Sequence, residues 1–131
     1  PDIGLYLDQV AKYINSYLTD FPDMAVTPSM ISNYAKQKLI DRVNRKTYTR
    51  TQILTLFLIV LFKNVISIEN IRHLLERSGN VTEDYEHFRN CLDQCLKENI
   101  SDNAGDDILF HIARALSAKM VLEEYFRETV N

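Results

Sequence analysis

The chain has 131 residues, of which 46% are apolar and 25% are charged, a composition that is typical of a soluble globular domain and excludes a disordered or collagen-like chain. It contains only three glycines and three prolines, too few for the many tight turns of a β-sandwich or barrel. The net charge of −3 excludes a protein that is basic throughout, but it leaves room for a local basic patch.

The sequence favours a cytosolic protein with no membrane contact. Its first residues lack the basic and apolar regions of a secretory signal, and two cysteines four residues apart make no disulfide framework. The most apolar segment, residues 53–62, is bracketed by Arg50 and Lys63 and is far shorter than the roughly 20 residues of a membrane span. We interpret this segment as a buried core helix.

The first two predicted elements are helices. Apolar residues at helical spacing predict a helix over residues 4–19, and Pro22 ends it. Thr27 followed by Pro28 is typical of a helix start, because the proline nitrogen carries no N–H that would need a partner in the first turn. This pair opens a short helix over residues 28–38.

The next segment, residues 41–49, lacks helical periodicity and is rich in residues that favour extended backbone. It predicts a small two-stranded hairpin that turns near Asn44. Thr49 and Gln52 then have the spacing of a capping box, in which each side chain bonds the other residue's backbone N–H. They open the core helix, which is predicted over residues 50–64.

Three further helices complete the chain. Ser67 caps a helix over residues 68–77, and Thr82 opens a helix over residues 83–98. A polar loop then leads to the last helix, over residues 107–127. The fold class is therefore all-α, with at most a minimal β-hairpin, and no internal repeat is present.

Positive charge is concentrated in one segment. Residues 36–50 carry six bases and one acid (+5), whereas residues 1–35 sum to −3 and residues 83–131 to −6. Such a patch is expected where a protein contacts phosphates, although a solvated surface strip explains the same charges. The six bases are Lys36, Lys38, Arg42, Arg45, Lys46 and Arg50.

Polar residues gather on one face of the predicted helix 28–38, within about 60° of Ser29 around the helix axis. The residues of this face are Ser29, Ser32, Asn33 and Lys36. Asparagine can bond adenine bidentately and lysine can reach guanine or phosphate, so the face suits base edges while the basic segment holds phosphates. An ordinary amphipathic helix with a polar outer face is the alternative. The opposite arc, predicted to pack inward, holds Met30, Ile31, Tyr34 and Ala35.

Three motifs, within residues 27–40, 45–53 and 67–75, resemble in order the winged helix-turn-helix of MerR-type transcriptional regulators. Tyr34 matches the tyrosine of the recognition helix in that pattern, and Tyr48 with Thr49 matches the Tyr-Ser that closes the wing. Lys46 takes the position of the wing arginine. The chain differs at Ser32 and Lys38, where the pattern has arginine and glycine. More closely, most of the chain resembles an uncharacterised bacterial family, domain of unknown function number 1836.

The MerR resemblance implies a homodimer that binds duplex DNA and regulates transcription, with residues 1–80 as the DNA-binding region and residues 81–131 as a C-terminal region for dimerisation or regulation, together in one compact domain. The residues expected in the major groove are Ser29, Ser32, Asn33 and Lys36. Those expected to hold phosphates are Arg42, Arg45, Lys46 and Arg50, with Tyr48 supporting the wing. The alternative is a helical protein-interaction module that keeps the fold and binds an acidic partner. The sequence identifies no small-molecule effector.

Catalytic and metal-binding patterns are weak. The chain has no Gly-rich phosphate loop, nucleophile elbow or His-x-x-x-His pair, so we expect neither an enzyme nor a cofactor. His87, Cys91 and Cys95 recur every four residues, but His87 and Cys95 lie about 12 Å apart along a helix, too far to share one metal ion. An adjacent pair would need ligands from elsewhere. We therefore expect no metal site, buried thiols, and a turn or helix-cap role for Asp107.

Overall fold

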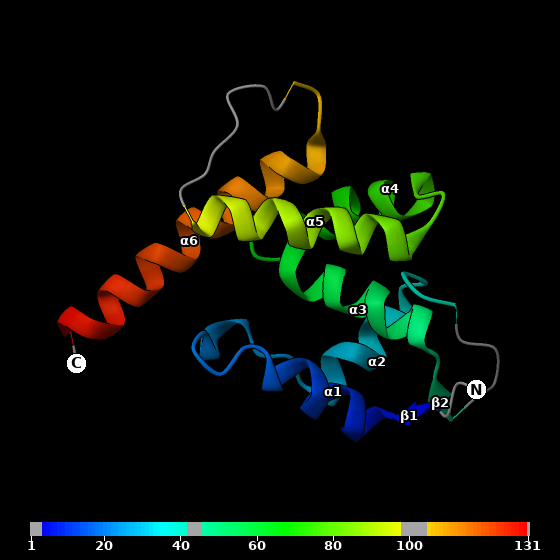
Figure 1. The fold of residues 1–131 in the computed structure, drawn as a ribbon. Helices are drawn as coiled ribbons and strands as arrows, with labels where there is room; N and C mark the ends of the chain where they lie inside the picture. Colours follow the sequence, from blue (N-terminus) through cyan, green and yellow to red (C-terminus); the bar gives the residue numbers. More distant parts are fainter. Residues whose placement is uncertain (1–3, 42–45, 98–104, 131) are drawn as a thin grey trace.

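The fold is described here from a computed structural model, in which residues 4–41, 46–97 and 105–130 are placed. These residues form six α-helices, one short 3-10 helix and a two-stranded sheet (Figure 1). The predicted helical fold class is confirmed. In chain order the elements are β1 (Leu5–Tyr6), α1 (Leu7–Ser16), η1 (Pro22–Met24), α2 (Pro28–Lys36), β2 (Thr47–Tyr48), α3 (Arg50–Phe62), α4 (Ile68–Arg77), α5 (Val81–Leu96) and α6 (Ile108–Val130).

Helix α3 lies at the centre of the molecule, with α1 and α2 on one side and α4, α5 and α6 on the other (Figure 1). Every residue from Thr55 to Val60 is buried, so this part of the helix has no polar face. The helix begins at the predicted capping box: the Thr49 Oγ1 accepts from the Gln52 N–H at 3.2 Å, and the Gln52 Oε1 accepts from the Thr49 N–H at 2.9 Å. The interpretation of this segment as a buried core helix is confirmed.

Helices α1 and α2 pack against each other across the turn that contains η1. Asn15, near the end of α1, holds this turn by two hydrogen bonds to the backbone of Val26. Its Nδ2 donates to the Val26 carbonyl and its Oδ1 accepts from the Val26 N–H, both at 2.8 Å. Thr27 then caps α2 by accepting from the Met30 N–H at 3.1 Å, as predicted. These bonds fix the orientation of α2 on α1.

Helix α2 ends at Lys36, slightly before the predicted boundary, in a motif that satisfies its last carbonyls. Lys38 has a φ of 60°, in the left-handed region, and the N–H groups of Lys38 and Leu39 donate to carbonyls of the last turn at 3.0 Å each. Arg72 of α4 adds a hydrogen bond from its Nη1 to the Gln37 carbonyl at 2.6 Å. The end of α2 is therefore tied to α4.

The small sheet differs from the predicted hairpin. Strand β2 pairs antiparallel with β1, with Leu5 opposite Tyr48 and Tyr6 opposite Thr47. The first helix runs over residues 7–16, and not 4–19. It begins later because part of its expected first turn is extended to pair with a distant segment. The turn that was predicted near Asn44 lies outside the described residues.

Helices α4, α5 and α6 cover the other side of α3, and α5 and α6 lie side by side (Figure 1). Ser67 caps α4 as predicted. Helix α5 begins two residues before the predicted start, because Asn80 and not Thr82 supplies the cap: the Asn80 Oδ1 accepts from the Glu83 N–H at 3.1 Å. One continuous cluster of buried side chains joins these helices to α1, α2 and α3.

Helix α6 is the longest element, and its C-terminal half extends beyond α5 (Figure 1). The predicted cap role of Asp107 is confirmed, since its Oδ1 accepts from the Phe110 N–H at 3.2 Å. In the described parts of the chain, no helix combines the length and apolar character that crossing a membrane requires.

Replacing Asn15 by alanine removes both partners of the Val26 backbone, which is 2% exposed. Each buried polar group left without a partner costs about 1–3 kcal/mol, so we expect Asn15→Ala to lower the free energy of unfolding by about 2–4 kcal/mol in a urea titration. Asn33→Ala is the matched control, since it removes an exposed amide and should change stability by less than about 0.5 kcal/mol. Equal effects of the two substitutions would contradict the role of Asn15.

The pairing of β1 with β2 is testable at Gly4. A Cβ at this position would lie 2.7 Å from the Cβ and Oγ1 of Thr47 and 3.0 Å from the Tyr48 carbonyl oxygen. We expect Gly4→Ala to lower the free energy of unfolding by about 1–3 kcal/mol, because the strands must separate to admit the methyl group. Gly79→Ala, with nothing within 4 Å of the new Cβ, should leave stability unchanged or raise it by about 0.5 kcal/mol. Identical urea midpoints would contradict the observed register.

Candidate nucleic-acid interface

The outer face of α2 is the centre of the candidate interface. Ser29, Asn33 and Lys36 are exposed, whereas Ser32 is partly buried. The four apolar residues predicted to point inward are buried or partly buried against the core, so the predicted orientation of the helix is confirmed. No acidic residue lies in α2. The helix therefore presents two hydrogen-bonding side chains and one cation to solvent, with no carboxylate of its own to repel phosphate.

The two tyrosines that carry the MerR resemblance belong to the core. Tyr34 is 5% exposed, on the inner face of α2, and burial raises the pKa of its phenol. Tyr48 is 3% exposed and lies in β2, opposite Leu5. Neither side chain presents its ring to solvent.

Four of the six basic residues of the segment 36–50 are among the described residues, and all four side chains are exposed. They follow the chain from the last residue of α2 to the first residue of α3. Within the described parts of the chain, no ion pair joins any of them to a carboxylate. Arg42 and Arg45 lie outside the described residues. The four described bases are Lys36, Lys38, Lys46 and Arg50.

An apolar groove with a volume of about 740 Å³ adjoins this basic segment, between α1, α3 and α5. Its lining includes a group of aromatic side chains around Phe57, and the rings of Tyr17 and Tyr85 lie 5.5 and 6.0 Å from the ring of Phe57. Arg50 of the basic segment also lines the groove. The volume is in the range of small-ligand pockets. The groove could not be predicted from the sequence, because its walls come from helices that are far apart in the chain.

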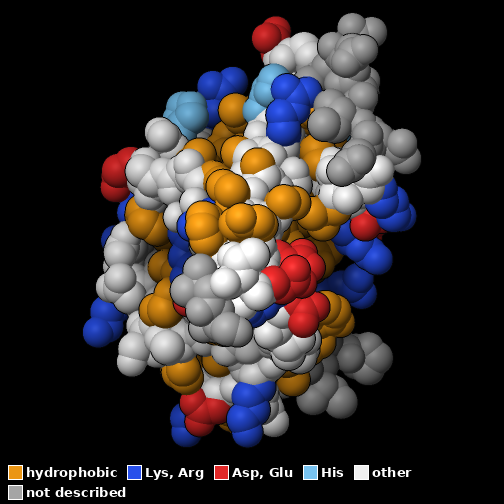
Figure 2. All heavy atoms as spheres, turned by 90° about the vertical axis from the view of Figure 1, so that its left-hand side faces the viewer, with side chains coloured by type: hydrophobic (Ala, Val, Ile, Leu, Met, Phe, Trp, Pro, Cys, Tyr) orange, Lys and Arg blue, Asp and Glu red, His pale blue; other side chains and the backbone are white. Residues whose placement is uncertain are grey.

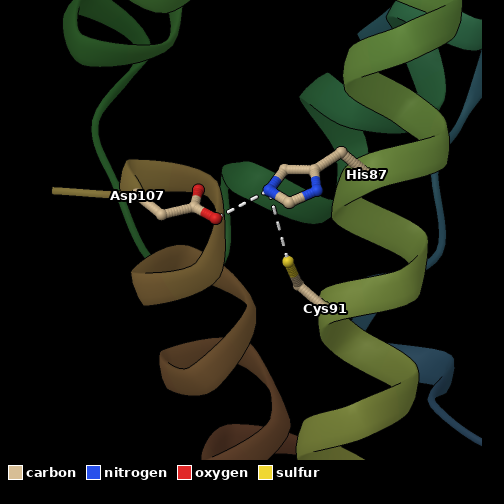
Figure 3. Close-up of side chains that lie close together, drawn as sticks. All are labelled: His87, Cys91 and Asp107. Atoms are coloured by element: carbon tan, nitrogen blue, oxygen red, sulfur yellow. Dashed lines mark hydrogen bonds and ion pairs between the residues drawn. The ribbon is translucent and has the colours of Figure 1, made fainter. Parts of the chain in front are cut away.

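A second cluster lies where α5 meets the start of α6 (Figure 3). The His87 Nε2 is 2.7 Å from the Asp107 Oδ2 and 3.6 Å from the Cys91 Sγ. Cys91 and Cys95 are both buried, as predicted, but Cys95 is not part of the group. The four-residue spacing in the sequence already indicated that His87 and Cys91 lie on the same face of the helix. Asp107 was missed as their partner, because it meets them only through the packing of α6 on α5.

The protonation of this cluster follows from its surroundings. Burial raises the pKa of the Cys91 thiol, and the charges of Asp107 and Cys95 raise it further. Burial also opposes ionisation of Asp107, but hydrogen bonds from His87 and the Phe110 N–H, together with the charge of His87, outweigh it and lower the pKa of that carboxyl. At neutral pH the cluster therefore holds a thiol beside a carboxylate.

Comparison with known proteins identifies the family and leaves the activity open. Residues 1–97 match the family described as domain of unknown function DUF1836, as the sequence predicts. The chain has no significant match among curated proteins or solved structures. The matched range includes α1 to α5, and therefore the whole candidate interface, but ends before α6. Since the match covers well over half of the sequence, the chain belongs to the DUF1836 family.

Proposed function

We propose that this protein binds duplex DNA through the outer face of α2 and regulates transcription, as a MerR-like winged helix-turn-helix protein. One observation carries the proposal: α2, the second helix of a packed pair, presents Ser29, Asn33 and Lys36 to solvent and contains no acidic residue. The second helix of a helix-turn-helix is the one that enters the major groove.

The dimensions and chemistry of α2 suit this role. Its nine residues give a helix about 13 Å long, which is close to the roughly 12 Å width of the major groove. Asn33 offers both a donor and an acceptor, the pair that reads adenine, and Lys36 donates to guanine or to phosphate. Ser29, in the first turn, bonds either a base or the backbone. The two bonds of Asn15 to Val26 support this reading, because they hold the helix before DNA binds.

The basic residues after α2 would hold the phosphates on either side of the groove. Lys38, Lys46 and Arg50 are exposed and have no carboxylate partner among the described residues. Arg42 and Arg45 belong to the same segment and to the same proposed contact set. Each neutralised phosphate releases bound counterions, so the affinity should fall steeply with salt.

The proposal includes a homodimer that forms through the C-terminal half of α6. Hydrophobic side chains gather on the face toward which this half extends (Figure 2). In this half of α6, four hydrophobic side chains are 56–59% exposed, at the helical spacing of a single stripe: Val121, Leu122, Tyr125 and Phe126. A two-fold contact would bury each stripe against its copy and present two α2 helices to half-sites about 34 Å apart.

The same apolar features favour the second candidate function, a helical protein-interaction module. The exposed stripe on α6 and the aromatic groove are surfaces that a partner protein can cover. In that case the basic residues after α2 bind an acidic protein, and this protein has no affinity for DNA. The salt titration below separates the two functions.

Binding of a labelled mixed-sequence duplex, measured by fluorescence anisotropy at increasing salt, tests the DNA proposal. We expect a log–log slope of several units for the wild type, reduced by about 2 per protomer in Lys38→Gln/Lys46→Gln, because each lost phosphate contact removes about 0.9. Lys97→Gln/Arg114→Gln makes the same charge change at exposed positions, directly after α5 and on α6, and should keep the wild-type slope. A folded, dimeric wild type that fails to bind at low salt would overturn the proposal and favour an acidic protein partner.

The dimer is tested by sedimentation velocity at several protein concentrations. We expect the wild type to sediment as a dimer and Tyr125→Glu to sediment as a monomer, because a carboxylate would be buried without a partner in the contact. Glu124→Gln changes an exposed neighbour that lies off the apolar stripe and should remain dimeric. A wild type that is monomeric at every concentration would contradict this part of the proposal.

A further inference from the structure

We propose that His87, Cys91 and Asp107 form a binding site for a divalent transition-metal ion of the zinc class, at the junction of α5 and α6 (Figure 3). The site lies across α3 from the DNA-binding face of α2, and the inference does not rest on the proposed function.

The three ligand atoms already surround one point. All of them lie within 4.8 Å of one another, and the two separations from the His87 Nε2 are 2.7 Å to Asp107 and 3.6 Å to Cys91. With metal–ligand bonds of about 2.0–2.3 Å at tetrahedral angles, ligand atoms are roughly 3.3–3.6 Å apart. An ion therefore requires the His–Asp pair to open by about half an ångström and the Asp–Cys pair, which lies within 4.8 Å, to adjust to roughly 3.5 Å, shifts that side-chain rotation supplies.

The helices fix the positions of these ligands. His87 and Cys91 are four residues apart on α5, so both side chains lie on the same face, one turn apart. Asp107 precedes α6, and its Oδ1 is held by the Phe110 N–H. That bond leaves the Oδ2 directed at His87, so a carboxylate from a second element completes the group. Ligands that are oriented by their own hydrogen bonds bind metal more tightly than free side chains.

The donor set selects the class of metal. One nitrogen, one sulfur and one oxygen suit zinc or cobalt, whereas calcium and magnesium take oxygen ligands. On binding, the Cys91 S–H bond breaks, its proton passes to solvent and the thiolate sulfur bonds the ion. With the Asp107 carboxylate, the thiolate balances the two positive charges, and His87 binds as a neutral imidazole. Three protein ligands leave a fourth position for water or another ligand.

Two of the three side chains are partly exposed, which gives the ion a path from solvent. The side chains of His87 and Asp107 are 51% and 34% exposed, whereas Cys91 is 5% exposed. The ion therefore reaches the imidazole and the carboxylate from solvent, and the sulfur lies on the protein side. The simpler reading is an ion pair between His87 and Asp107 that caps α6 and binds no metal.

Titration of the reduced protein with Co²⁺, followed by absorption, separates the two readings. We expect saturation at one ion per chain, with a sulfur-to-cobalt charge-transfer band and the visible bands of four-coordinate cobalt, and we expect Zn²⁺ to displace the cobalt. Cys91→Ser should abolish the charge-transfer band. Cys95→Ser is the matched control: this cysteine is also buried, one turn further along α5, and its loss should leave the band intact.

A second variant keeps the test independent of folding. Asp107→Asn retains an oxygen that can cap α6, so we expect it to remain folded by circular dichroism. Because a direct carboxylate ligand is lost, Co²⁺ should bind more weakly by at least the roughly 10-fold factor that the loss of an outer-shell partner costs. Zn²⁺ should raise the Tm of the wild type and of Cys95→Ser, but not of Cys91→Ser. A folded, reduced wild type without the charge-transfer band, or a band that disappears with Cys95 and not with Cys91, would overturn the proposal.

Discussion

The burial of α3 is the constraint on which the rest of the structure depends. A helix with no polar face is stable only where apolar side chains cover it all round, and neither half of the chain has enough helices to do so alone. Tyr13 of α1 and Tyr17, which directly follows this helix, reach Phe57 from one side. Phe88 of α5 packs on Phe62 from the other side, with ring centroids 4.9 Å apart. The two layers are therefore joined into one core, and the aromatic groove remains where they do not meet completely.

This arrangement separates two surfaces with different chemistry. On one side of α3, the turn held by Asn15 and the bond from Arg72 to Gln37 fix both ends of α2 and point its polar face outward. On the other side, the packing of α6 on α5 brings Asp107 to His87. The first surface is rich in cations and the second offers metal-ligating groups, so the polyanion and the divalent cation that we propose would not compete for the same residues.

The sequence predicted what depends on neighbours a few residues apart. The caps at Thr27, Thr49 and Ser67 were predicted correctly, because each bonds a backbone N–H three residues away. Helical periodicity likewise identified the buried face of α2 and so defined the outer face of the candidate interface. The pairing of β1 with β2 and the meeting of Asp107 with His87 were not predictable in this way, since both join segments that only tertiary packing brings together. Asn80 was not predicted as the cap of α5, because Thr82, two residues later, also has a side chain that can cap a helix.

The backbone conformation at Lys38 lowers stability, whereas its side chain adds positive charge to the surface. A left-handed φ costs a residue with a side chain about 1–2 kcal/mol, whereas glycine adopts it without that cost and would make the same two backbone hydrogen bonds. Against a typical folding margin of about 5–15 kcal/mol, this strain is an appreciable fraction of what keeps a domain folded. The lysine adds a cation just beyond the C-terminus of α2, where it also meets the negative end of the helix dipole. Glycine at this position would therefore favour stability, whereas lysine favours the positive charge of the segment that follows α2.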